Sequence, residues 1–202
     1  MTIVLCGQAS VSGFTNGHCQ DALFAKLVDV VVSGSTAFVS DAGNNVIRSI
    51  SLTSGVVATL CGSPSGAAGL LDSMLSSLSA MSVSLLDTPM FLTVSGSSLV
   101  FTQAGSSPSV RTVDISSGSV TTLAGSSLFY SASIAVGDCG YVSMFGPTGI
   151  IARTSNDITF IDGALTTPAS SLNAAQSMIR TLSLTASPVF KTLPPTSSKL
   201  YC

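Results

Sequence analysis

Few residues in this 202-residue chain are of the types that carry out acid–base or metal chemistry. His18 is the only histidine, glutamate is absent, and the nine acidic residues are all aspartates. A Ser-His-Asp arrangement would use His18 with Asp21 or Asp29, but no Gly-x-Ser-x-Gly nucleophile elbow lies at an expected strand-to-helix turn. No Asp-x-Asp-x-Asp-Gly calcium loop is present either. We therefore predict no catalytic, cofactor-binding or metal-binding residues, and we expect the chain not to be an enzyme.

Arginine is the charged residue that recurs with a regular pattern. Arg48, Arg111 and Arg180 lie in the related segments VIRSI, VRTV and MIRTL, and they are 63 and then 69 residues apart. Ligand contact at each arginine is one interpretation. Because aspartates stand before two of them in the repeat, we favour a structural role in which carboxylate and guanidinium tie strands together.

The expected ion pairs are Asp41–Arg48 in the first unit and Asp162–Arg180 in the third. Gln103 stands in the second unit where the first has Asp41, and an amide oxygen accepts only a neutral hydrogen bond. The second unit is therefore expected to be held together more loosely.

The elements that must position these residues are short strands, four in each unit. Runs rich in Val, Ile, Thr and Phe alternate with turns that contain Gly, Asn and Ser, as half-buried strands and their hairpins require. The expected ranges are 27–32, 36–40, 46–52 and 56–60, then 90–95, 98–102, 110–115 and 119–123, then 148–152, 157–161, 178–184 and 188–193.

The composition excludes several classes of protein. Only 8% of the residues are charged, against roughly 25% in an ordinary soluble domain. Seven basic residues and a net charge of -2 argue against a nucleic-acid partner. Hydrophobic residues make up 46% of the chain, which argues against disorder, and Ser, Gly and Thr interrupt every apolar run before it could span a membrane.

The repeated units resemble the NHL-repeat β-propeller family. The first unit carries Phe24, the core V-x-D-x-x-N-x-x-I-R-x-I and the closing G-x-V-x-T-L-x-G. The second keeps SVRTVDISSGSVTTLAG, and the third keeps MFGPTGI and MIRTLSL but closes on Pro194-Pro195. NHL-like propellers that act as enzymes are associated with metal-binding histidines in a central channel, and this chain has one histidine.

The resemblance implies an all-β, propeller-like fold spanning residues 1–202 as a single unit. We expect about three four-stranded antiparallel blades, at about 7–62, 63–125 and 126–202, plus one stray N-terminal strand at Thr2 to Leu5. The first residues lack the basic leader and apolar length of a secretory signal. Short helical insertions are expected at 70–86, from the spacing of Leu71, Leu75, Leu78 and Met81, and at 167–178.

The five cysteines are Cys6, Cys19, Cys61, Cys139 and Cys202, and none has the close spacing of a zinc site. Cys6 and Cys61 occupy one repeat position, and Cys19 and Cys139 another. A Cys6–Cys19 disulfide is therefore our first choice, and the other pairings stay open. The odd count leaves one thiol free or paired with another chain, and the alternative is that several are buried, unpaired small residues.

Three blades make a poor circle, since propellers use about 4–8. The chain is a piece of a longer propeller, half of a six-bladed pair, or an open arc that pairs with neighbours through exposed edges. We therefore expect a non-enzymatic extracellular structural module of a fibre, coat or cell-surface appendage, whose partner is itself or the rest of a longer chain. A ligand-binding or sensor propeller for a peptide or glycan is the alternative.

The setting is expected to be oxidising and extracellular because the chain combines several cysteines with many hydroxyl residues and few charges. No N-glycosylation sequon occurs among the asparagines. The turns Ser63-Pro64-Ser65 and Thr196-Ser197-Ser198 are candidates for O-linked glycans, which would hydrate a surface of low charge. The alternative is that Ser and Thr fill turns and outward strand positions.

Overall fold

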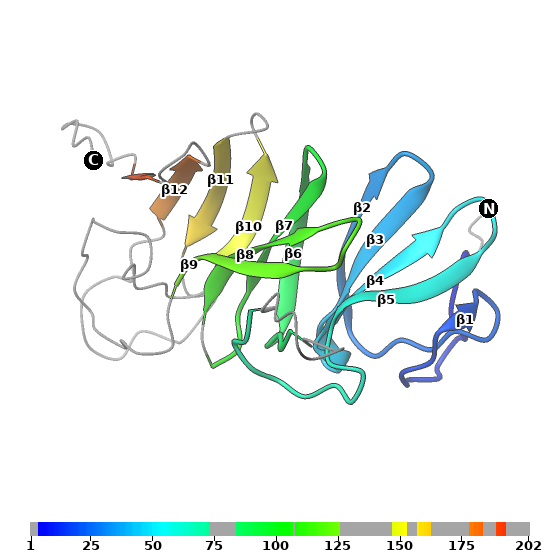
Figure 1. The fold of residues 1–202 in the computed structure, drawn as a ribbon. Coiled ribbons are helices and arrows are strands. Elements are labelled where there is room, and N and C mark those ends of the chain that lie inside the picture. The colour runs from blue at the N-terminus through cyan, green and yellow to red at the C-terminus, as the bar shows by residue number, and fades with distance from the viewer. Residues whose placement is uncertain are drawn as a thin grey trace, which may run out of the picture.

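Three antiparallel sheets of successive strands make up the fold in the computed structural model (Figure 1). The structure describes residues 4–72, 84–106, 108–125, 147–152, 157–162, 178–183 and 189–192. We call the sheets blades 1, 2 and 3 in chain order. They stand side by side, with blade 1 at one end of the molecule, blade 3 at the other and blade 2 between them (Figure 1).

The strands of each blade follow one another in sequence order. Blade 1 contains β2 (Leu27–Ser33), β3 (Thr36–Asp41), β4 (Val46–Ser51) and β5 (Val56–Gly62), with β1 (Gly17–His18) added to the outer edge of β5. Blade 2 contains β6 (Pro89–Ser95), β7 (Ser98–Gln103), β8 (Ser109–Asp114) and β9 (Val120–Ala124). Blade 3 contains β10 (Pro147–Ala152), β11 (Asp157–Asp162), β12 (Met178–Ser183) and β13 (Val189–Thr192).

The hairpin turns depend on residues that accept positive φ. Gly34 joins β2 to β3 with φ 57°, and Gly96 joins β6 to β7 with φ 59°. Asn45 adopts a left-handed conformation after the 3-10 turn Ala42–Asn44, and it leads directly into β4. Because glycine and asparagine adopt this region at little cost, the strands are reversed where the sequence predicted.

The blades contact each other through their first strands, β2 against β6 and β6 against β10. Ser40 Oγ donates to the carbonyl oxygen of Met90 at 2.6 Å, and the amide of Leu92 donates to Asp29 Oδ2 at 2.8 Å. A buried apolar cluster fills the space between blades 1 and 2, with Phe38, Ile47 and Cys61 from blade 1 and Leu86, Leu92, Leu99, Phe101, Val113 and Val120 from blade 2 and the loop before it.

The predicted strands agree with the observed ones to within two residues at each end, and the four-stranded antiparallel blades are confirmed. Of the stray strand expected at Thr2 to Leu5, Thr2 and Ile3 lie outside the described residues, and Val4 and Leu5 are not in a strand. A short strand that the sequence did not predict, Gly17–His18, adds to the edge of blade 1. It forms because the loop before blade 1 folds back along β5.

The expected insertion helices fall mostly outside the described residues, which hold parts of 70–86 and only Met178 of 167–178. At 70–86, Leu71 pairs with Leu85 in an antiparallel bridge, so the described ends of this segment are extended. Within the described part of the chain, no helix is long and apolar enough to cross a membrane.

Candidate functional site

Arg48 lies at the centre of a buried polar cluster on the outer half of blade 1. Its Nη1 donates to Asp41 Oδ2 at 3.2 Å and to the carbonyl oxygen of Leu23 at 3.1 Å. Its Nη2 donates to the carbonyl oxygen of Thr15 and to Asn16 Oδ1, both at 2.7 Å. The Asp41–Arg48 ion pair is present and both side chains are fully buried. The arginine thus joins β3 and β4 to the loop that precedes blade 1.

The rings of Phe14 and Phe24 also pack on the guanidinium of Arg48, with the Cζ atom 5.0 and 4.9 Å from their centroids. Burial lowers the pKa of Arg48 below its ordinary value, although the charge and hydrogen bond of Asp41 act in the opposite direction. Because the buried guanidinium has lost its contact with water, its charge is stabilised by the protein groups around it. The Nε atom is buried without a hydrogen-bond partner in the structure.

Arg111 repeats the arrangement in blade 2 with different partners. Its Nη1 donates to Gln103 Oε1 at 3.2 Å and to the carbonyl oxygen of Leu85 at 2.7 Å. Its Nη2 donates to the carbonyl oxygen of Leu71 at 2.8 Å and to Asp72 Oδ1 at 2.7 Å. Sequence analysis named only the neutral acceptor Gln103 for Arg111, and the structure adds a carboxylate, because the loop before blade 2 supplies Asp72. The looser packing expected of blade 2 stays a prediction.

Each guanidinium therefore contacts one carboxylate and one side-chain amide, and the strand and the loop supply these two groups in opposite order in the two blades. In blade 1 the carboxylate is on the strand and the amide of Asn16 is in the loop, whereas in blade 2 the amide is on the strand and Asp72 is in the loop. Thr122 donates to both oxygens of Asp72, at 2.9 Å from its amide and 2.8 Å from its hydroxyl. Burial raises the pKa of Asp72, but these hydrogen bonds and Arg111 outweigh it and lower the pKa overall.

The third predicted pair can be placed only by backbone register. Arg180 on β12 pairs with Phe160 on β11, just as Arg48 pairs with Val39 and Arg111 with Phe101. Asp162 occupies the register position of Asp41 and Gln103. The side chains of Asp162 and Arg180 lie outside the described part of the structure, so this ion pair stays a prediction.

The predicted Cys6–Cys19 disulfide is confirmed, and it joins the N-terminal segment to the loop beside β1. Cys61 is a free thiol buried between blades 1 and 2, and burial raises its pKa to about 12. It therefore fits the alternative interpretation, in which a cysteine is a buried, unpaired small residue. Cys139 and Cys202 lie outside the described residues.

His18 lies on β1 at the outer edge of blade 1, while the strands next to the neighbouring blades are β2, β6 and β10. Asp29, one of its two conceivable partners, instead accepts the amide of Leu92 across the blade interface. Within the described ranges, no group of three or more His, Cys, Asp or Glu side chains is placed to hold a metal ion. The structure therefore does not bring His18 and Asp29 together.

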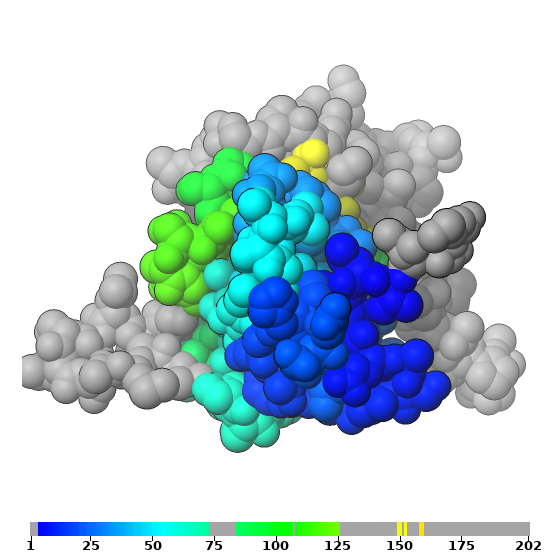
Figure 2. Space-filling view, turned by 90° about the vertical axis from the view of Figure 1, so that its right-hand side faces the viewer, coloured from blue at the N-terminus to red at the C-terminus, as the bar shows by residue number. Residues whose placement is uncertain are grey.

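The surface with the clearest functional character is the apolar face of blade 1 that points away from blade 2. We call it the open face, and its exposed members are Leu27, Val30, Val32 and Leu52. Its buried members are Ala37, Val39, Ile50 and Val57, which form one cluster with Phe24 of the loop before β2, and Cys6 packs against this cluster. Figure 2 looks onto this end of the molecule, where the N-terminal segment (blue) and blade 1 (light blue to cyan) meet the viewer.

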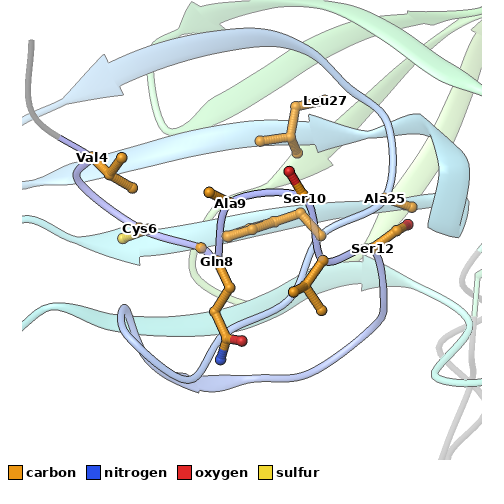
Figure 3. Close-up of a pocket in the computed structure, with 11 residues that line it drawn as sticks. Val4, Cys6, Gln8, Ala9, Ser10, Ser12, Ala25 and Leu27 are labelled. Carbon is orange, nitrogen blue, oxygen red and sulfur yellow. The ribbon is translucent and has the colours of Figure 1, made fainter.

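A hollow lies between the N-terminal segment and this face. One cavity of about 480 Å³ is lined by Val4, Leu5 and Cys6 together with residues of β2 and β3. An adjoining cavity of about 520 Å³ is lined by Gln8, Ser10 and Ser12 of the N-terminal segment and by Phe24 and Leu27 (Figure 3). The lining is mostly apolar with a few hydroxyl and amide groups, which suits another polypeptide or a small ligand.

One of the candidate glycosylation turns is partly enclosed. Ser63 is buried, and its Oγ lies 2.8 Å from the Oγ of exposed Ser65. A glycan on Ser63 would not fit, which leaves Ser65 as the accessible hydroxyl of that turn. The second turn, at 196–198, lies outside the described residues.

Comparison with known proteins places the fold among β-propellers. The chain matches no protein-family model and no curated protein sequence. A chain of a nidogen/laminin complex is similar with a TM-score of 0.51 and 12% identity, over 86% of this chain and 50% of that one. A gluconolactonase from Xanthomonas campestris is similar with a TM-score of 0.49 and 16% identity, over 79% of this chain and 43% of that one. The hydrazine synthase of Kuenenia stuttgartiensis has a TM-score of 0.37 and 14% identity, over 87% of this chain and 53% of that one.

These likenesses show the architecture and not an activity, because the identities are low and the named proteins differ in function. The chain spans about half the length of the solved propeller chains it matches. The described residues therefore form three antiparallel blades of a β-propeller-like fold.

Sequence reasoning missed Asn16 and Asp72. Both come from loops 32 and 39 residues before the arginines they contact. No common spacing pointed to them, because Asn16 stands 7 residues before Leu23 and Asp72 stands 13 residues before Leu85, the leucines whose carbonyl oxygens accept from the same guanidinium groups.

Proposed function

We propose that this protein is a non-enzymatic extracellular assembly module of NHL-like blades, a subunit of a fibre, coat or cell-surface appendage. The observation that carries the proposal is the open face. Val30 and Val32 are each 58% exposed on a sheet whose other side is packed against blade 2. Contiguous apolar surface of this kind marks an interface in a soluble protein.

The chemistry of the chain supports an assembly role over catalysis. Charged residues make up 8% of the chain, so few charges oppose association, and burial of apolar surface contributes roughly 25 cal/mol per Å². One histidine and no glutamate leave few groups for acid–base work. The Cys6–Cys19 disulfide supports an oxidising, extracellular location.

The proposal is tested by size-exclusion chromatography with light scattering on the purified chain under oxidising conditions. We expect particles heavier than the 20.3 kDa chain, because the open face is covered in the assembled form. A stable particle of 20.3 kDa at every concentration, without aggregation, would refute the assembly role.

The second candidate function is a ligand-binding or sensor propeller for a peptide or glycan. The cavity of about 520 Å³ beside Gln8, Ser10 and Ser12 favours it, because polar groups at the rim of an apolar hollow can orient a ligand (Figure 3). Thermal stabilisation of the monomer by a peptide or oligosaccharide, lost in Ser10→Leu and kept in Ser65→Leu, would favour this function over assembly.

A further inference from the structure

We propose that Asn16 is a site of self-modification, at which the fold directs water to replace the side-chain amide and so gives an aspartate that pairs with Arg48. The reactive dipeptide is Asn16-Gly17, the one place in the sequence where glycine follows asparagine. The modification goes beyond the proposed assembly role and does not depend on it. It is carried by the contacts that already surround the amide of Asn16.

The reaction needs no reagent other than water. The backbone nitrogen of Gly17 attacks Cγ of Asn16, and the new N–C bond closes a cyclic imide. The bond from Cγ to Nδ2 breaks, and Nδ2 leaves as ammonia with the proton that the Gly17 amide has lost. Water then opens the imide, placing its hydroxyl on a carbonyl carbon and its remaining proton on the ring nitrogen, and nothing is oxidised or reduced.

Gly17 suits the role of the attacking residue. It is next to Asn16 in the chain, so ring closure is intramolecular, and it has no side chain to hinder its nitrogen. No other group lies within 4 Å of the place where a Cβ would stand on Gly17, and Asn16 is exposed, so water reaches both residues. Gly17 pairs with Val57 in β1, and only this two-residue edge strand has to open before the nitrogen attacks.

The side-chain carbonyl of Asn16 is already polarised. Arg48 Nη2 donates to its Oδ1 at 2.7 Å, and Thr59 Oγ1 donates to the same oxygen at 3.4 Å. Attack at Cγ turns this oxygen into an oxyanion, which a positive donor in place stabilises, as oxyanion holes do in acyl transfer. Asn16 Nδ2 lies 3.2 Å from Thr59 Oγ1, so the hydroxyl can relay a proton to the departing nitrogen.

Blade 2 shows that the product has a place in this fold. There the loop group that faces the arginine is already a carboxylate, and Asp72 Oδ1 lies 2.7 Å from Arg111 Nη2. Asn16 Oδ1 lies at the same distance from the arginine of blade 1. Thr122 donates its hydroxyl to Asp72 at 2.8 Å, and Thr59 has the same register position in blade 1. An aspartate at position 16 would therefore gain the partners that Asp72 has.

The fold also selects which bond of the imide water breaks. Attack at Cγ gives aspartate and leaves the main chain unchanged, whereas attack at the main-chain carbonyl carbon of Asn16 gives isoaspartate and lengthens the backbone. Because Arg48 polarises the Cγ carbonyl, attack at Cγ is favoured. The longer backbone of isoaspartate would also displace Gly17 from Val57. Aspartate is therefore the expected product in the folded chain.

Peptide mapping by mass spectrometry tests the site on the purified native chain held at neutral pH and digested at acid pH. We expect the peptide that contains Asn16 to change from amide to acid with time. The peptide that contains Asn44 and Asn45 is the internal control and should keep its amides, because neither residue precedes glycine. Each conversion adds one negative charge to a chain of net charge -2, so anion-exchange chromatography follows the same reaction.

The ratio of the two products tests the role of Arg48. An isoaspartate-specific methyltransferase labels only the isoaspartate form. We expect aspartate to exceed isoaspartate in the folded chain and isoaspartate to exceed aspartate in urea, where the guanidinium no longer contacts residue 16.

Thr59→Val tests the hydroxyl, because valine has nearly the same shape and suits a strand. We expect the native conversion to slow by about tenfold, which is less than the roughly 10²–10³ that one oxyanion donor contributes in an enzyme, because this contact is exposed. Thr53→Val, in the turn between β4 and β5, is the matched control and should keep the wild-type rate. Far-ultraviolet circular dichroism should be unchanged in both variants.

Three results would overturn the inference. The first is a native chain that keeps the amide of Asn16 while a synthetic peptide of residues 10–18 converts, because the fold would then protect the site. The second is isoaspartate as the main product in the folded chain, and the third is an unchanged rate in Thr59→Val. None of these results involves the open face, so the proposed assembly role is judged separately.

Discussion

The Arg48 cluster can be tested quantitatively by moving its carboxylate from strand β3 to the loop before blade 1. Asp41 accepts hydrogen bonds from the amide of Ala25 at 3.1 Å, from Asn44 Nδ2 at 2.8 Å and from Arg48 Nη1 at 3.2 Å. Asp41→Asn removes the charge and turns one acceptor into a donor that faces these donors. Because removal of one partner of a buried ion pair costs about 3–5 kcal/mol, we expect the free energy of unfolding to fall by that amount.

Blade 2 indicates how this loss can be reversed. There the carboxylate is in the loop, as Asp72, and the amide is on the strand, as Gln103. Adding Asn16→Asp to Asp41→Asn copies that arrangement, because Asn16 Oδ1 already lies 2.7 Å from Arg48 Nη2. Hydrogen bonds to charged groups contribute about 1.5–3 kcal/mol, so we expect the second change to restore about 2 kcal/mol.

The assay is urea unfolding of the four variants at pH 7, followed by far-ultraviolet circular dichroism and analysed as a double-mutant cycle. Asn16→Asp alone serves as the control, and we expect it to change stability by less than about 1 kcal/mol, because Thr59 Oγ1 can donate to the new carboxylate as Thr122 does to Asp72. A coupling energy below about 0.5 kcal/mol would show that neutralisation of Arg48 does not govern the stability of blade 1.

Three further results are expected from single sites. Cys19→Ser should destabilise the N-terminal segment by about 3 kcal/mol, because the disulfide closes a loop with a sequence separation of 13; hydrogen exchange of residues 4–24 measures this, and unchanged protection would contradict it. Serine hydroxyls and amides of the turn at 116–117 lower the pKa of Asp114 to about 2, so the free energy of unfolding should be constant above about pH 4 and fall as the pH drops toward 2. Asp114→Asn should reduce this fall in stability at low pH. An unchanged fall in the variant would exclude Asp114 as its source. The thiol of Cys61, whose pKa is raised to about 12, should resist a thiol reagent at pH 7 in the native protein and react in urea, and rapid native labelling would contradict its burial.

The sequence by itself determined the strands, the hairpin turns and the pairing of Asp41 with Arg48. Each of these depends on residues close together in the chain. Alternating apolar residues select a half-buried strand, Gly34 and Gly96 reverse it, and the antiparallel hairpin of β3 and β4 brings positions 41 and 48 to one side of the sheet. The Cys6–Cys19 pairing was accessible for the same reason, because it closes a short loop.

Only the tertiary structure decided which loop atoms complete each arginine cluster and which apolar face stays uncovered. Asn16 and Asp72 reach Arg48 and Arg111 through the path of loops that no local preference specifies. Val30 and Leu92 have the same strand position and similar side chains, yet one is exposed and the other buried. The difference arises because blade 1 covers Leu92 and no described part of the chain covers Val30, and burial depends on what packs against a residue as well as on the residue itself.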